Sequence, residues 1–477
     1  MRQLPFALSI LLSVGAWVVS LEAAPLEIDS VLDLARSAPA EVAADALIRI
    51  AGTDKVAPKR AADLFQEAFA LASAAPEPYK RRADSDHAQG PPAYLTRVYS
   101  QDLDRQSLQL RAVEGLLPLS SAKARELFEQ IPVLELSVVT CDNFLVYDIS
   151  RFYEVLGQVA ATTFDPKETR EGEPARFLAR YVGGMTSAVQ IAPAARLLAT
   201  VGLSDSEFLT VLTSFAGALS RISGDDRSFT SGAREAGPEI VRLIQLSAHR
   251  GASPLFLIEA YRQFLVSNLS AVRCADHKSQ VDSAAAFFNE NLSTAQVQPL
   301  GEKELAPAKL EGEAKGATWC ENPECRAMRQ QFTGLIRRDN GEVYQVSQRE
   351  QSEWQIKVRD LLNSLAGWTQ STGATPGEHF REMIGFYNDL LAIIPNGSTR
   401  EFVLRSFLNY LSQAQLPPEN RIEWLFPIRQ LVARVRLDPQ GLGRAADDLS
   451  RSNPVIALYI ALEQAAPRSI SEVMPLL

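Results

Sequence analysis

Almost every stretch of this 477-residue chain repeats its apolar residues with the period of an α-helix. Between Ala57 and Ala75, for example, apolar residues follow Ala61 at intervals of three, four, seven, eight and eleven positions, which places them on one helix face. Short segments rich in glycine, proline and serine separate such runs. Short connections make consecutive helices antiparallel neighbours. The sequence therefore predicts an all-α protein of stacked antiparallel helical hairpins, either an α-solenoid or an irregular α/α superhelix.

One segment interrupts this pattern. Residues 294–318 consist almost wholly of Ala, Pro, Gly, Glu, Lys and Gln. Such a composition buries too little apolar surface to offset the entropy lost on ordering, and a structureless loop of this length is uncommon inside a compact domain. We therefore expect an N-terminal helical domain over residues 24–293, a low-complexity linker or long loop over 294–318, and a C-terminal helical domain over 319–477.

The first residues have the pattern of a secretory signal peptide. Arg2 gives a short positive start, and the run from Leu4 to Val19 is mainly apolar. The small residues Ala23 and Ala24 follow it. We expect a signal peptide over residues 1–23 and a mature protein in the periplasm or outside the cell. A permanent membrane anchor is the alternative, but the apolar run is shorter than the ~20 residues that span a bilayer.

The charge balance excludes one class of partner. The formal net charge is −9, and the only basic run is Lys80-Arg81-Arg82, whereas proteins that bind the phosphate backbone carry a basic face. We expect no nucleic-acid partner. The excess of arginine over lysine and the high alanine content are typical of GC-rich bacterial genomes, so the expected destination is a bacterial envelope.

Two positions in the N-terminal part carry a family motif. In each, an alanine precedes a phenylalanine by four residues and a proline follows, a pattern found in the second helix of a tetratricopeptide unit. The residues are Ala61, Phe65 and Pro76, then Ala124, Phe128 and Pro132. The sequence thus resembles tetratricopeptide-type helical-repeat proteins at the level of the fold. The resemblance implies stacked helical hairpins and transfers no binding residues.

A polar stripe is the candidate binding surface. From Asn143 the pattern predicts one long helix, and the side opposite its apolar face carries polar residues at helical spacing. These residues are Tyr147, Arg151, Glu154 and Gln158. Aromatic and arginine side chains often anchor protein partners, and stacked hairpins offer a long concave surface for them. The alternative is a solvated face with an ion pair between Asp148 and Arg151.

Two polar stretches are predicted to be loops. Pro76–Pro92 is polar and contains Gly90, and Ser223–Gly237 is rich in glycine, serine and aspartate. Because proline favours the first turn of a helix, we expect a separate helix over Pro238–His249.

Motifs for catalysis are few. The sequence contains no metalloprotease, nucleophile-elbow, P-loop or dinucleotide-binding pattern. Ser120 and Lys123 match the short S-x-x-K motif of serine β-lactamases, but capping of a helix by Ser120 or Ser121 explains these residues as well. We therefore assign no catalytic residue and no cofactor, and we favour a role without catalysis while the question of an enzyme stays open.

The four cysteines suggest two disulfides, as is usual in an oxidising compartment. We favour Cys320 with Cys325, because the loop between them is short, and hence Cys141 with Cys274. A bond from Cys274 to Cys320 or Cys325 is the rival pairing. A further alternative is a zinc site made of Cys274, His277, Cys320 and Cys325, whose spacing is allowed.

These features together predict an exported helical-repeat protein that binds or scaffolds a protein or peptide partner. The competing hypothesis is an exported hydrolase or lyase on an all-helical (α/α) toroid. A sugar-cleaving site requires paired carboxylates beside aromatic platforms, and the sequence shows no such cluster.

Overall fold

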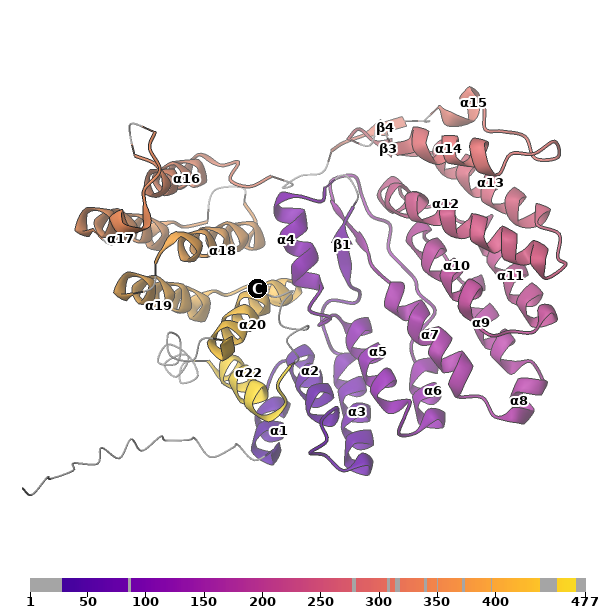
Figure 1. Ribbon diagram of the computed structural model, residues 1–477, viewed down its shortest axis with the longest axis horizontal. Coiled ribbons are helices and arrows are strands. Elements are labelled where there is room, and N and C mark those ends of the chain that lie inside the picture. Colours follow the sequence, from indigo (N-terminus) through magenta and orange to yellow (C-terminus); the bar gives the residue numbers. More distant parts are fainter. Residues whose placement is uncertain are drawn as a thin grey trace, which may run out of the picture.

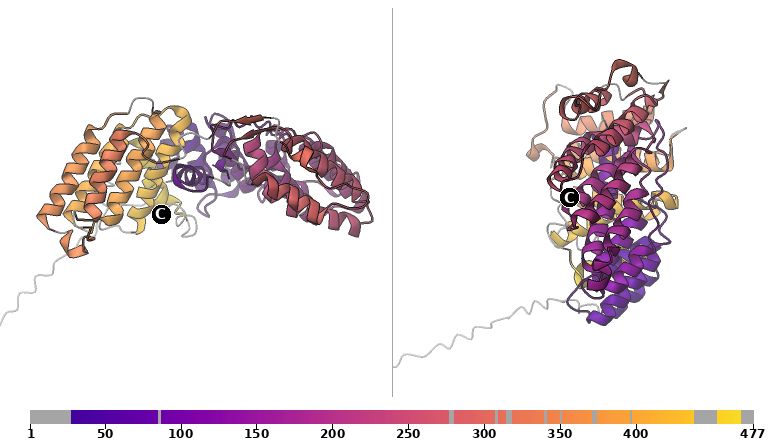
Figure 2. Two further views of the ribbon diagram at one scale, coloured as in Figure 1. Left: turned by 90° about the horizontal axis from the view of Figure 1, so that it is seen from above. Right: turned by 90° about the vertical axis from the view of Figure 1, so that its right-hand side faces the viewer.

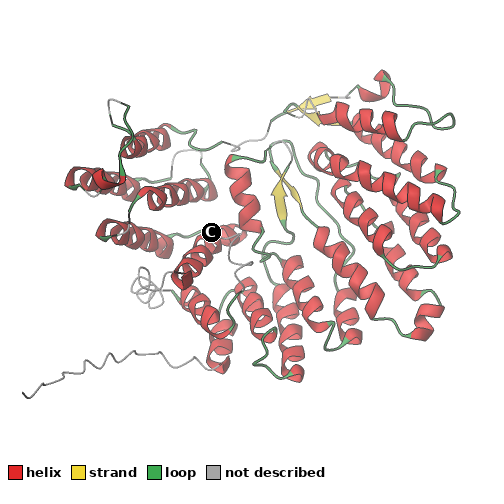
Figure 3. Cartoon of the chain, in the orientation of Figure 1, coloured by secondary structure: helices red, strands yellow, loops and turns green. Residues whose placement is uncertain are grey.

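The computed structural model describes residues 28–84, 87–276, 280–306, 309–313, 318–338, 341–349, 351–370, 374–395, 397–437 and 453–468. Within these ranges helices dominate, and each strand has only three residues (Figure 3). The predicted all-α class is confirmed, whereas the narrower assignment as an α-solenoid or superhelix stays a prediction. The predicted signal peptide, residues 1–23, lies outside the described residues.

The helices of the N-terminal part form two packed rows (Figure 1). Their bounds are α1 (Ile28–Arg36), α2 (Ala40–Ala51), α3 (Pro58–Ala72), α4 (Gly90–Tyr99), α5 (Arg105–Leu116), α6 (Ser121–Glu129), α7 (Ser150–Thr162), α8 (Pro166–Arg170), α9 (Glu173–Gly183), α10 (Ile191–Thr200), α11 (Asp205–Leu219), α12 (Asp226–His249), α13 (Leu255–Leu269) and α14 (Gln280–Asn291). In one row α2, α5, α7, α10, α12 and α14 follow one another. In the second row α3, α6, α9, α11 and α13 pack against the first.

Side-chain caps fix the start of several helices. Asp104 accepts a hydrogen bond from the backbone N–H of Ser107, and Ser204 forms a capping box with Glu207. Ser120, by contrast, precedes α6 without making a side-chain cap bond.

Two short ribbons join segments that are distant in sequence. β1 (Arg81–Ala83) pairs antiparallel with β2 (Leu145–Tyr147), and β3 (Val272–Cys274) pairs parallel with β4 (Lys309–Glu311). The expectation of a continuous loop over Pro76–Pro92 was therefore wrong. Local composition could not reveal β1, because its hydrogen-bond partner lies more than sixty residues further along the chain.

Helix α12 corrects a second prediction. It runs without a break from Asp226 to His249 and contains Pro238, where a loop and a separate helix were expected. An interior proline costs a helix about 3 kcal/mol, so tertiary contacts must offset it. The first half of α12 supplies them, because Arg227 is fully buried and Gly232 lies against the backbone of the 3-10 turn η1 (Ala188–Gln190).

The C-terminal helices extend the array from its beginning. They are α16 (Pro323–Ile336), α17 (Ser352–Gly367), α18 (Pro376–Ile393), α19 (Ser398–Gln413), α20 (Arg421–Leu437) and α22 (Pro454–Ala465), with the 3-10 turns η2 (Val346–Gln348) and η3 (Pro418–Asn420). α22 packs against α1 and α2, and α20 packs against α4. Figures 1 and 2 show α1–α5 between α16–α22 and α6–α14. After α14 the chain therefore returns past its own N-terminal helices.

The segment predicted as a linker contains regular structure. It contains the four-residue helix α15 (Glu302–Leu305), and Val297 and Leu300 are buried. Arg262 of α13 donates a hydrogen bond to the carbonyl oxygen of Gln298 at 2.8 Å and pairs with Glu304 at 2.7 Å. The start of the segment thus packs against α13, while the division into domains over 24–293 and 319–477 stays a prediction.

No helix within the described ranges combines the length and the apolar character that crossing a bilayer requires.

Candidate functional site

The four residues of the predicted stripe do not share one helical face. Helix α7 begins at Ser150, and Tyr147 belongs to β2. The Tyr147 side chain is buried, with its ring edge-on to Tyr79 and the guanidinium of Arg81 5.6 Å from its centroid. The expected helix from Asn143 was therefore wrong over residues 143–149, since α7 begins at Ser150 and residues 145–147 form the ribbon with β1.

Arg151 lies in the first turn of α7 and binds acids from other elements. Its guanidinium contacts the carboxylate of Glu114 on α5 and lies 3.2 Å from Oδ2 of Asp102. The expected ion pair with Asp148 is not formed, because Asp148 lies 4.0 Å from Lys80 instead. Arg151 thus crosslinks α7 to α5 and to the turn before α5.

Glu154 and Gln158 meet the expectation of an accessible polar surface. Both are exposed, and they line a groove of about 480 Å³ between α7 and α10. Across the groove lie Arg196 and Thr200 of α10, and Tyr153 forms part of its wall. The structure therefore brings two of the four predicted residues together in one concave site.

A glycine sets the depth of this groove. A Cβ on Gly157 would lie 2.7 Å from Cδ1 of Leu197, closer than real Cβ contacts. The missing side chain lets α7 approach α10 at the point where Glu154 and Gln158 flank the opening. Nearby, Gln190 donates a hydrogen bond to the Tyr153 hydroxyl at 3.3 Å, which holds the aromatic ring in the wall.

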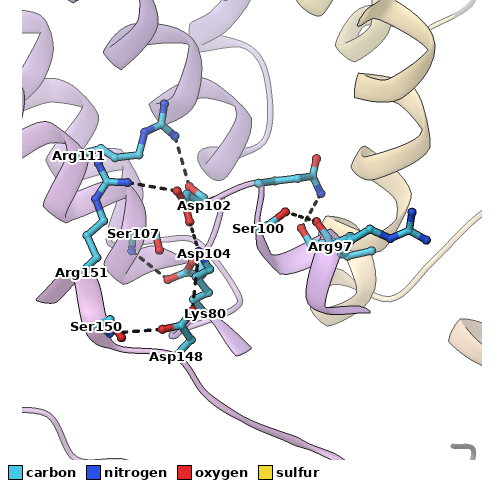
Figure 4. Close-up of polar contacts among 12 residues, drawn as sticks. Lys80, Arg97, Ser100, Asp102, Asp104, Ser107, Arg111, Asp148, Ser150 and Arg151 are labelled. Carbon is cyan, nitrogen blue, oxygen red and sulfur yellow. Dashed lines mark hydrogen bonds and ion pairs between the residues drawn. The ribbon is translucent and has the colours of Figure 1, made fainter. Parts of the chain in front are cut away.

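A charged network lies at the N-terminal end of α7 (Figure 4). Lys80 pairs with Asp102 at 2.9 Å, and Arg111 donates to the Asp102 backbone carbonyl at 3.3 Å. Next to them Asp104 is fully buried, and burial raises the pKa of its carboxyl to about 7, although the hydrogen bond from Ser107 acts in the opposite direction.

The groove offers recognition groups. It presents a carboxylate from Glu154, an amide from Gln158, a guanidinium from Arg196 and hydroxyls from Ser150 and Thr200. These groups can donate and accept hydrogen bonds along an extended ligand. Glu154 is the only carboxylate among the lining residues, so the pair of acids that a glycosidase needs does not meet in this groove.

The cysteines form the favoured disulfides. Cys141 is bonded to Cys274 and Cys320 to Cys325, with Cα–Cα distances of 5.4 and 5.0 Å. The rival pairing and the zinc alternative are therefore wrong, because the thiolates that they require are consumed; His277 lies outside the described residues. Within the described ranges, no group of three or more His, Cys, Asp or Glu is placed to hold a metal ion.

Sequence reasoning missed a buried charge cluster beside the Cys141–Cys274 bond. Arg227 of α12 is fully buried and pairs with Asp84 at 3.1 Å and with Asp276 at 2.8 Å. It also donates to the Cys141 carbonyl oxygen, and Nδ1 of His87 lies 2.7 Å from Asp84. The residues come from four separate segments, so no local spacing could have signalled the cluster. Its contacts tie α12 to the loop after β1 and to the disulfide.

We also compared the chain with known proteins. No protein-family model, no curated protein and no solved structure matches it. The resemblance to tetratricopeptide-type proteins therefore stays a prediction.

Proposed function

We propose that this protein is an exported binding or scaffolding module of the bacterial envelope, and that the groove between α7 and α10 holds a protein or peptide partner. The observation that carries the proposal is the position of Glu154 and Gln158. Two exposed polar residues, selected by their spacing, flank one groove together with Arg196.

The character of the groove supports an extended ligand. Its lining combines hydrogen-bonding side chains with apolar surface from Tyr153, Leu197 and Val201. Binding sites for peptides typically place a few polar groups among apolar walls. Tyr147 is buried elsewhere and Arg151 faces a different pocket, so neither belongs to the proposed groove.

The proposed export rests on two observations. The signal-like pattern over residues 1–23 predicts secretion, and the two disulfides are compatible with an oxidising compartment outside the cytoplasm. A protein of this kind meets its partner in the envelope.

The test is capture of envelope proteins by the purified chain. We expect the double variant Glu154→Ala/Gln158→Ala to retain at least tenfold less of a specific partner than the native chain, because each charged or polar anchor contributes about 1–3 kcal/mol. Circular dichroism should remain unchanged, since both side chains are exposed.

A matched control is available on another helix. Glu259 and Gln263 of α13 are the same residue types at the same spacing, and both are exposed. The variant Glu259→Ala/Gln263→Ala should capture the partner as the native chain does. Equal loss in both double variants, or turnover of a polysaccharide or peptide substrate by the native chain, would contradict the proposal.

A further inference from the structure

A second pocket lies where the C-terminal helices meet the N-terminal ones. It has a volume of about 500 Å³ and is open between α2, α5, the start of α7 and the segment after α22. Four arginines line it, and Glu114 is the single acid among the lining residues. The arginines are Arg49, Arg111, Arg151 and Arg468. Positive side chains from four separate segments therefore surround one cavity.

The carboxylates near this pocket are shared between cations. Oε1 of Glu463 accepts from both Arg49 at 2.9 Å and Arg468 at 2.7 Å. Arg151 forms an ion pair with Glu114, and Asp102 forms ion pairs with both Arg151 and Lys80. A guanidinium carries five N–H groups, so Arg151 has donor capacity for further oxygens beyond its contacts with Glu114 and Asp102.

A second carboxylate is shared behind the pocket wall. Fully buried Asp45 lies 2.8 Å from Arg111 and 3.9 Å from Arg429. Burial raises the pKa of Asp45, but Arg429, Arg111 and Arg49 together outweigh it and hold the pKa below its ordinary range. Burial and the charges of Arg429 and Arg49 also lower the pKa of Arg468, as expected where guanidinium groups crowd together.

Arg49 has buried donors that no described group uses. Its side chain is only 7% exposed, and Nη2 binds Glu463 and the carbonyl oxygen of Ala466. Its Nε and Nη1 have no hydrogen-bond partner among the described residues. A buried, charged donor without an acceptor is costly, and Arg49 therefore has capacity for an oxygen acceptor beyond those that the described residues supply.

We propose that this pocket binds an oxyanion, the phosphate or carboxylate group of a small ligand, with Arg49 and Arg151 as its principal donors. Guanidinium groups bind carboxylates and phosphates through two parallel hydrogen bonds, which suits a ligand group with at least two oxygens. Glu114 lies on the same wall and competes with the ligand for Arg151. The site is separate from the groove between α7 and α10, so its test is independent of the proposed function.

Isothermal titration calorimetry of the mature chain tests this proposal. The chain is titrated with inorganic phosphate and, separately, with succinate, and a chloride salt keeps the ionic strength constant. We expect saturable binding of one anion per chain. The tighter of the two probes identifies the ligand group as phosphate or carboxylate. Arg49→Gln and Arg151→Gln should each weaken binding by about tenfold or more, since each removes a charge-assisted hydrogen bond.

Glu114→Gln should change the affinity for the anion in the opposite direction. Removal of the competing carboxylate should strengthen binding by about threefold or more, a gain that misfolding cannot produce. Arg60→Gln is the matched control, because Arg60 makes an exposed ion pair with Asp29 and neither residue lines the pocket. It should leave the affinity unchanged.

The proposal is wrong if neither probe binds saturably, if Arg151→Gln leaves the affinity for the anion unchanged, or if Glu114→Gln does not raise that affinity. If Arg49→Gln fails to fold because Glu463 loses a partner, the more exposed Arg151 and Glu114 still decide the question.

Discussion

Individual side chains in this protein take their chemistry from burial more than from sequence position. Asp104 has an ordinary capping role, which its place before an apolar run predicts, yet the carboxyl is fully buried. Its Oδ2 has no hydrogen-bond partner among the described residues. The cap was predictable from sequence, whereas the raised pKa depends on the packing of other helices around it.

The raised pKa of Asp104 gives a pH-dependent prediction. With a folded pKa of about 7 and an ordinary value of 3.8, its contribution to stability is present at low pH and is lost as the pH rises towards 7. Asn keeps the capping oxygen and cannot ionise. Urea unfolding should therefore show the advantage of Asp104→Asn over the native chain growing by roughly 2–3 kcal/mol between pH 5 and pH 8. A constant difference at both pH values would refute this account.

At the level of elements, close contacts decide where a helix can run. The sequence around Gly232 has the composition of a loop, but the structure uses its glycine to bring α12 against η1. A Cβ at this position would lie 2.6 Å from the backbone carbonyl oxygen of Ala188. The same residue type that favours a loop in sequence thus permits a helix–helix contact in the fold.

Gly232→Ala should consequently destabilise the protein, although alanine is the better helix former. We expect a loss of about 1–3 kcal/mol in urea unfolding, because the neighbour that must move is backbone. Gly334→Ala in α16 is the control, since a Cβ there meets nothing within 4 Å. That substitution should be neutral or stabilise by up to about 1 kcal/mol. Equal effects at the two sites would show that the contact with η1 is unimportant.

Across the whole molecule, the order of helices in space differs from their order in the chain. α20 and α22 pack against α4, α1 and α2, and ion pairs with the fully buried carboxylates of Glu41 and Asp45 cross this junction. Arg421 lies 3.0 Å from Glu41, and Arg429 lies 3.9 Å from Asp45. Ion pairs of this kind favour one packing of α20 and α22 on the N-terminal helices, since a shifted packing would leave buried charges unpaired. The arginine pocket exists only because the two halves meet here.

The two disulfides should stabilise the molecule unequally. Cys141 and Cys274 are 133 residues apart, whereas Cys320 and Cys325 are 5 apart. Because a crosslink restricts the unfolded chain more when its loop is longer, Cys141→Ala/Cys274→Ala should cost about 5 kcal/mol and Cys320→Ala/Cys325→Ala about 2 kcal/mol. Chemical denaturation of both double variants checks the difference. A larger loss from the short loop would contradict the prediction.

The sequence by itself determined the all-α class and most helix positions, and it favoured the disulfide pairs that the structure forms. These features depend on contacts between residues a few positions apart, or on cysteine chemistry, and a local pattern records them. Only the tertiary structure decided the ribbon of β1 with β2, the course of α12 through Pro238, and the separation of Tyr147 and Arg151 from Glu154 and Gln158. Each of these depends on which surfaces meet across more than about thirty residues, and loop closure at that range leaves no periodicity in the sequence.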